Sequence, residues 1–240
     1  GSATVDAGCG LAKALGFRLY DRRGRSIPDG GGGLSRLARI RHDTADPRLS
    51  TTSFIALADV QNPLLGPNGA APVFAPQKGA NAVEVLRLER NLLHWHRIIQ
   101  RTWGLDVASA NGAGAAGGLG AGCLAFLGAQ LIPGAQWVAE QIGLAKAIGW
   151  ADLVLTGEGR LDRQTLAGKG PALVARLARV HRKPVIAVAG AVADRTRLRS
   201  LGLTRCLAIT PPGMALSEAF AQAETNLEKT AAALMMAFRR

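Results

Sequence analysis

Alternating strand and helix patterns after Gly149 constrain the fold of this chain most. Short β-rich apolar runs predict strands over residues 152–155, 184–188 and 206–209. Helical patterns follow each run, over residues 171–181, 194–201 and 216–238. Strands that alternate with helices are typical of a parallel sheet covered by helices. The sequence therefore predicts an α/β region whose ligands gather outside the carboxyl ends of its strands.

The first of these strands leads into an unusual stretch, ADLVLTGEGRLDRQTLAGKGP, at residues 151–171. Gly157-Glu158-Gly159 and then Asp162 follow the predicted strand, and Lys169 stands between two glycines just before Pro171. Proline suits the first position of a helix, and a helix start attracts anions. Glycines allow a ligand to approach the backbone closely. The order of strand, acidic glycine turn, basic glycine turn and helix predicts a phosphate site.

Other interpretations of the glycine-rich segments are weaker. A Walker A motif needs Ser or Thr after its lysine, but Gly170 follows Lys169. A dinucleotide fingerprint needs a glycine where Asp162 stands. A second G-x-G-x-x-G match, Gly112 to Gly117, follows no convincing strand and lies in a segment rich enough in glycine to match often. The simplest alternative for residues 151–171 is an ordinary strand–helix connection with a solvated lysine.

Composition limits the classes of protein that fit. The chain has 240 residues, enough for one or two domains, and 48% of them are hydrophobic, which excludes a disordered chain. Its apolar runs are too short to span a membrane, and its first residues do not form a signal peptide. The three cysteines are far apart in sequence, at Cys9, Cys123 and Cys206. This pattern indicates thiols in a reducing cytoplasm, with no membrane partner.

The net charge of +12 is compatible with nucleic-acid binding. The arginines are, however, spread along the chain, and few aromatic residues lie among them to stack on bases. We therefore expect a basic protein that handles anionic small molecules and no nucleic acid. A non-catalytic basic binding protein remains an alternative.

The first half of the chain supplies further candidate residues. Asp59 and Asn62 follow a predicted strand over residues 53–60, and Lys78 lies in a later turn. Both Asp59 and Asn62 could instead cap the local backbone as Asx-turn residues. A helical pattern covers residues 81–102 and includes two histidines, His94 and His96. Residues two apart point to different faces of a helix, so a metal site formed by both is not expected.

Four segments together resemble the bacterial class I glycerate kinases. TGEGRLDRQTLAGKGP at 156–171 resembles the signature of that family, and ADVQNPLLGPNGAAPVFAPQKGA at 58–80 resembles its Asp-Val-x-Asn-Pro-Leu…Gly-Pro-Gln-Lys-Gly segment. GAGAAGGLGAG at 112–122 resembles its glycine-rich stretch, and GSATVDAG at 1–8 its Gly-Gly-Ser-Ala-x-x-Asp-Gly loop. The resemblance runs in order over essentially the whole chain.

The sequence departs from this family pattern in a few places. Ala7 stands where glycine is usual, and Ala58 and Gln61 are mild replacements. Family members also begin with an upstream α/β segment that holds an Asp-Ser-Phe-Lys-like motif, and these residues contain no such motif. From the resemblance we expect a family member that lacks its N-terminal third or so, and expect the 240 residues alone to be inactive.

The resemblance implies a kinase that phosphorylates D-glycerate with ATP and Mg²⁺ in organic acid metabolism. The product would be 2-phosphoglycerate or 3-phosphoglycerate. It also implies two lobes, with residues 1–148 forming most of a middle α/β lobe and residues 149–240 the C-terminal part of a Rossmann-like α/β lobe. The partners would be glycerate and ATP, and a homo-oligomer is compatible with the family. An oxidoreductase that uses the Gly112–Gly117 match is the enzymatic alternative.

The matched motifs carry the expected site residues. The residues that the resemblance assigns to catalysis are Asp162, Asp59, Asp6 and Lys78. Those assigned to phosphate or nucleotide binding are Gly157, Glu158, Gly159 and Lys169. Ser2 and Asn62 are assigned to the substrate, and Asp162 and Glu158 to Mg²⁺. Phosphoryl transfer depends on positioning and charge neutralisation, which fits this set of carboxylates, lysines and glycines.

Overall fold

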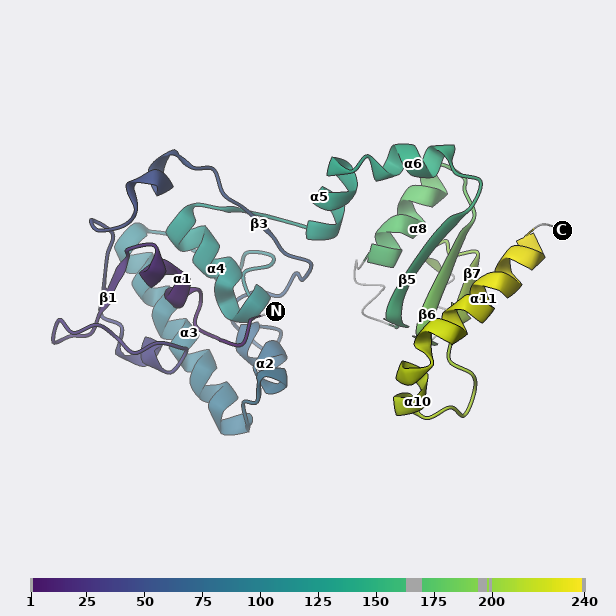
Figure 1. The fold of residues 1–240 in the computed structure, drawn as a ribbon. Helices are drawn as coiled ribbons and strands as arrows, with labels where there is room; N and C mark the ends of the chain where they lie inside the picture. The colour runs from purple at the N-terminus through teal and green to yellow at the C-terminus, as the bar shows by residue number, and fades with distance from the viewer. Residues whose placement is uncertain (1, 163–169, 194–197, 199, 239–240) are drawn as a thin grey trace. The chain divides into compact units, whose positions relative to one another are not determined.

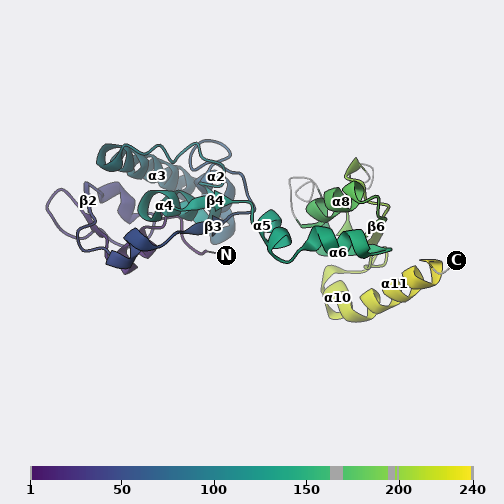
Figure 2. The same cartoon turned by 90° about the horizontal axis from the view of Figure 1, so that it is seen from above.

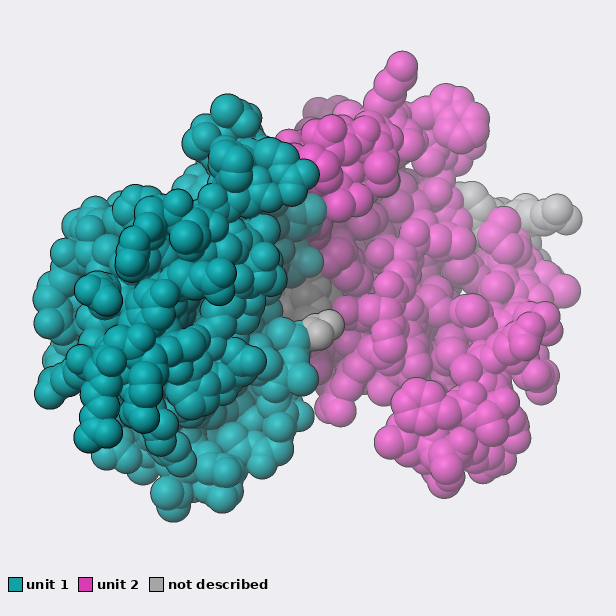
Figure 3. Space-filling model, turned by 60° about the vertical axis from the view of Figure 1, so that its left-hand side comes forward, with its two compact units in different colours: residues 1–134 teal, residues 135–240 magenta. Residues whose placement is uncertain are grey.

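The computed structural model describes residues 2–162, 170–193, 198 and 200–238. The chain divides into two compact units, Gly1–Gly134 and Ala135–Arg240, which are coloured separately in Figure 3. The division into lobes at residue 148 that the resemblance implies is a separate division of the chain and stays a prediction. Each unit has its own cluster of buried apolar side chains.

Unit 1 is organised around one long helix, α3 (Ala82–Trp103), which confirms the predicted helix over residues 81–102. Asn81 starts it with a capping box: its side chain accepts from the Glu84 amide, and the Glu84 carboxylate accepts from the Asn81 amide. Gly104 ends it in a left-handed conformation. Buried side chains along one face, including Leu92, Trp95 and Ile99, form the centre of the core.

Shorter elements surround α3 in Figure 1. The helices of unit 1 are α1 (Cys9–Ala14), α2 (Ala70–Phe74) and α4 (Ala115–Leu127), with 3₁₀ turns η1 (Gly33–Arg36), η2 (Pro47–Thr51) and η3 (Pro76–Lys78). Strands β1 (Arg18–Tyr20) and β2 (Arg39–Arg41) pair antiparallel, and β3 (Ile55–Leu57) and β4 (Gln130–Ile132) pair parallel. The short sheets leave most of the core to helices.

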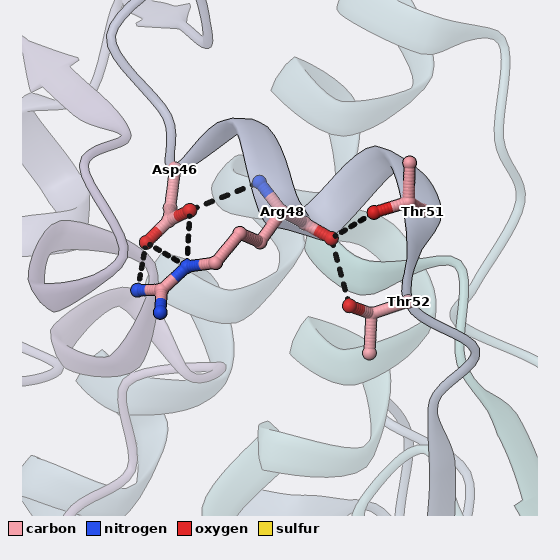
Figure 4. A network of polar contacts seen from close by, with 4 residues as sticks. All are labelled: Asp46, Arg48, Thr51 and Thr52. Atoms are coloured by element: carbon pink, nitrogen blue, oxygen red, sulfur yellow. Dashed lines mark hydrogen bonds and ion pairs between the residues drawn. The ribbon is translucent and has the colours of Figure 1, made fainter.

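A surface network starts η2 (Figure 4). The Asp46 carboxylate accepts from the Arg48 amide and from the Arg48 guanidinium. These bonds lower the pKa of Asp46 to about 2, and the bond from the Arg48 guanidinium has the largest effect. Thr51 and Thr52 donate their hydroxyls to the Arg48 carbonyl. The network caps a turn on the surface, where an ion pair contributes little to stability.

Unit 2 contains the predicted parallel sheet. Its strands are β5 (Val154–Leu161), β6 (Val185–Val192) and β7 (Arg205–Ala208), in the order β5-β6-β7. Its helices are α5 (Gly134–Gln141), α6 (Leu144–Trp150), α8 (Gly170–Val180), α10 (Leu216–Ala221) and α11 (Ala223–Phe238). Val154, Val185 and Ala187 pack with Ala175 and Ala178 of α8 in one buried cluster. Figure 2 shows α8 and the α10–α11 pair on different sides of the strands.

Two details of unit 2 differ from the sequence prediction. The predicted acidic turn is wrong: β5 continues through Gly157, Glu158 and Gly159 and ends at Leu161, because these residues pair with β6. The predicted C-terminal helix divides into α10 and α11 at Gln222. The predicted helix over residues 194–201 lies largely outside the described residues. None of the helices in the described part of the chain is long and apolar enough to cross a membrane.

Candidate functional site

A lysine joins two distant segments of unit 1. Lys78, at the end of η3, donates from Nζ to Ser2 Oγ at 2.9 Å and to the Thr4 carbonyl at 2.7 Å. Ser2 Oγ in turn donates to the carbonyl of Ala116 in α4, at 2.8 Å. The structure therefore brings together residues from the predicted loop at 1–8, the segment at 58–80 and the glycine-rich stretch.

The environment of Lys78 is partly protected from water. The side chain is half-buried, and burial lowers the pKa of its ammonium below the ordinary value, while the Asp6 carboxylate acts in the opposite direction. An ammonium has three protons to donate. Two of them are held by Ser2 and Thr4, and within the described residues Lys78 makes no further hydrogen bond.

Asp6 lies in the loop at residues 1–8 that also holds Ser2 and Thr4, and its carboxylate accepts hydrogen bonds from backbone amides. It is 7% exposed, and its Oδ1 accepts from the Thr4 hydroxyl and the Gly8 amide, both at 3.2 Å. Its Oδ2 accepts from the Gly10 amide at 3.0 Å. Ala7 and Gly8, directly after it, have φ of 51° and 71°, which is left-handed backbone. The carboxylate thus holds together a strained loop that leads into α1.

The glycine-rich stretch forms the wall beside this lysine. Inside α4, the residues Ala116, Gly117 and Gly118 are all left-handed and interrupt the helix. A Cβ at Gly117 would lie 2.1 Å from the Thr4 carbonyl oxygen and 3.0 Å from Lys78 Nζ, so only glycine fits. The Gly112–Gly117 match is explained by this close packing, and residues 104–111, all described, contain no strand that a dinucleotide fingerprint requires.

Asn62 and Asp59 lie on the segment that leads to Lys78. Asn62 Nδ2 donates to the Asn68 carbonyl at 2.8 Å, and the Asn62 carbonyl accepts from the Gly114 amide at 2.9 Å. Asp59 is exposed just after β3, and a Cβ at Gly134 would lie 3.0 Å from its Oδ1. The Asn62 side chain therefore bonds to nearby backbone, but as a donor to a residue six positions later, which is not the geometry of an Asx-turn.

The two carboxylates predicted to hold Mg²⁺ lie in unit 2. Glu158 is part of β5, and Asp162 follows the carboxyl end of that strand, with Oδ2 3.6 Å from Arg160 Nε. Lys169 lies outside the described residues. Within the described residues, no cluster of three or more His, Cys, Asp or Glu side chains is suited to a metal ion. These two carboxylates lie four residues apart along the chain, and they supply oxygen donors of the kind that Mg²⁺ uses when substrate phosphates complete its shell.

A large cavity of about 960 Å³ lies beside these strands. Gly157, Gly159 and Gly190 line it from β5 and β6, and Phe220 and Leu227 line it from α10 and α11. No motif in the sequence predicted this cavity. The helical spacing of Leu216, Phe220 and Leu227 gave the only signal, since it indicated an apolar helix face.

Comparison with known proteins places these features in one family. The model of the glycerate kinase family matches residues 1–239. The chain is 44% identical over 232 residues to a glycerate kinase of Halalkalibacterium halodurans, and that match covers 96% of this chain and 61% of the relative. It is 41% identical to the glycerate 2-kinase of Escherichia coli, covering 95% of this chain and 60% of that protein. The chain thus spans about 60% of the length of these curated relatives.

A solved structure gives the same result. A crystal structure of a putative glycerate kinase 2 from Salmonella typhimurium aligns with a TM-score of 0.76 at 40% sequence identity. The alignment covers 100% of this chain and 64% of that one. The mixed α/β fold with parallel sheets is therefore shared with this neighbour.

Proposed function

The chain belongs to the glycerate kinase family, and on that premise we propose that the protein transfers a phosphoryl group from ATP to D-glycerate. The product is 2-phosphoglycerate or 3-phosphoglycerate. The cluster around Lys78 is the observation that carries the proposal. It places a half-buried ammonium, held by Ser2 and Thr4, at the meeting point of three motifs. A small anionic substrate such as glycerate fits a single fixed cation of this kind.

In this proposal, one lobe binds glycerate and the other binds ATP. Residues 1–148 form most of a middle lobe that binds glycerate, and residues 149–240 form the C-terminal part of a Rossmann-like lobe that handles ATP. The parallel sheet β5-β6-β7 supports the second assignment, because ligands of such sheets bind at the carboxyl ends of the strands. Asp162 lies at one such end.

The glycerate contacts come from unit 1. Lys78 binds the carboxylate of glycerate, and Ser2 and Asn62 line the substrate position. Asp59, exposed after β3, is the carboxylate proposed to orient the reacting hydroxyl.

The phosphate contacts come from unit 2. Gly157 and Gly159 let the triphosphate approach β5, Lys169 contacts a phosphate, and Glu158 and Asp162 hold Mg²⁺. Their oxygen donors fit that ion, since it binds through one or two carboxylates together with substrate phosphates. When bound, Mg²⁺ neutralises charge on the phosphates. We further propose that the protein works in the cytoplasm.

The direct test is formation of ADP with D-glycerate, ATP and Mg²⁺. The assay uses the 240 residues and, in parallel, the full-length protein if its coding sequence continues beyond them. Lys78→Met should lower kcat/KM for D-glycerate by about 100-fold, because a fixed charge–carboxylate contact is lost. Lys146→Met, which removes an exposed lysine of α6, is the matched control and should match wild type. Wild-type protein without glycerate-dependent ADP formation would refute the proposed function.

A further inference from the structure

The Asp6 carboxylate accepts its hydrogen bonds from residues that lie close to it along the chain. The Thr4 hydroxyl, the Gly8 amide and the Gly10 amide all donate to it, and its side chain is buried. Releasing Asp6 for a substrate would break these bonds and free a loop with two successive left-handed residues. Its geometry is that of a group that fixes the loop, and this differs from the catalytic role that the family resemblance assigns to it.

Thr4 connects Asp6 to Lys78 through its two ends. Its hydroxyl donates to Asp6 Oδ1 at 3.2 Å, and its main-chain carbonyl accepts from Lys78 Nζ at 2.7 Å. The place of that carbonyl is further limited by Gly117, where a Cβ would lie 2.1 Å from its oxygen. A change in the position of Thr4 would therefore move the ammonium.

We propose that Asp6 and Thr4 are positioning residues for Lys78. Asp6 holds Thr4 in place, and the Thr4 carbonyl and Ser2 hydroxyl hold two protons of the ammonium, so that the third is directed at the carboxylate of the substrate. This inference rests on the proposed function for the identity of the anion. Orientation of one contact contributes to substrate affinity, and its loss should affect KM for glycerate more than the transfer step.

The test compares Thr4→Val, which removes only the hydroxyl, with Thr4→Ser, which keeps it. In the full-length protein, Thr4→Val should raise KM for D-glycerate by about three- to tenfold, the effect of losing one hydrogen bond. KM for ATP and kcat should change by less than about twofold. Thr4→Ser should restore the wild-type KM. Thr52→Val is the control, since the Thr52 hydroxyl donates to the Arg48 carbonyl on the surface at 2.7 Å (Figure 4).

A second measurement does not depend on activity. In protein labelled with ¹⁵N-lysine, the Lys78 ammonium, assigned with Lys78→Arg, should exchange its protons with water faster in Thr4→Val and in Asp6→Asn than in wild type. Unchanged exchange, unchanged KM for glycerate in Thr4→Val, or failure of Thr4→Ser to restore that KM would overturn the positioning role. If wild type forms no ADP but its ammonium responds to these variants, the proposed function fails while the positioning of Lys78 stands.

Discussion

Ala7, in the loop before α1, has a backbone conformation that favours glycine. Ala7 is fully buried and left-handed, with φ of 51°, at a position where the glycerate kinase pattern described above has glycine. A left-handed conformation costs a non-glycine residue about 1–2 kcal/mol. The Ala7 methyl group recovers part of this cost through its burial. This chain therefore tolerates alanine at the expense of some strain.

Replacing Ala7 by glycine tests this balance. Ala7→Gly should change the free energy of unfolding by less than about 0.5 kcal/mol, since relief of strain offsets the lost methyl group. Ala12→Gly is the matched control, because Ala12 is equally buried but lies within α1. It should destabilise by about 1.5–2 kcal/mol through lost helix propensity and burial. Denaturant unfolding measures both, and equal losses would contradict the strain at Ala7.

A single buried histidine makes the stability of the folded chain depend on pH. His96 of α3 is 7% exposed, and its Nε2 lies 3.6 Å from Asp106 Oδ1. Burial lowers the pKa of His96 below its ordinary value, and Asp106 partly opposes this. The unfolded chain therefore binds more protons than the folded one near the ordinary histidine pKa. Stability from this group is complete above about pH 6.5 and is lost as the pH falls below that value.

The expected result is a free energy of unfolding that rises as the pH increases toward about 6.5 and then levels off. His96→Gln should flatten that rise, because the titrating group is gone. Asp106→Asn should lower the pKa of His96 further, as measured by NMR titration of the imidazole, since the opposing carboxylate is removed. A pKa that rises in Asp106→Asn would contradict this account.

At the scale of elements, β5 shows why glycines lie in a strand. Gly157 and Gly159 are two residues apart on β5 and both line the cavity of unit 2. A Cβ at Gly157 would lie 2.5 Å from the Val188 carbonyl oxygen, whereas a Cβ at Gly159 would meet nothing within 4 Å. One glycine is required by the pairing of β5 with β6, and the other is not.

This pair gives a matched substitution. Gly157→Ala should destabilise the protein by about 1–3 kcal/mol, because the strands must separate to fit the methyl group. Gly159→Ala should change stability by less than about 0.5 kcal/mol. Urea unfolding monitored by circular dichroism distinguishes the two. Similar losses at both positions would mean that glycine flexibility, and not contact with Val188, determines the effect.

At the scale of the whole molecule, each compact unit has its own core. Unit 2 also has the cavity of about 960 Å³, which is lined largely by apolar residues. Phe220 is 73% exposed and Leu155 is 53% exposed, and both line that cavity. Exposed apolar patches of this kind bind apolar molecules or partners.

A fluorescent apolar dye such as ANS should therefore bind to unit 2. Phe220→Glu should lower the dye fluorescence by about half or more, since a charge at the rim opposes binding. Leu86→Glu is the control: Leu86 is 65% exposed on α3 and does not line the cavity. If both variants lower the signal equally, the dye reports general surface hydrophobicity and the cavity is not its site.

The sequence by itself determined the family, the parallel sheet and the long helix, which was predicted over residues 81–102. The assignment of Lys78 and Asp162 to candidate sites also came from the sequence and stays a prediction. Periodicity, glycine placement and motif order are local properties, and local properties can be read along a chain. Tertiary structure alone decided which groups meet. Lys78 joins Ser2 and Thr4 across a separation of more than 70 residues, and Asp6 faces backbone amides. The acidic glycine segment became part of β5 because pairing with β6 outweighs the local preference of glycine for a turn.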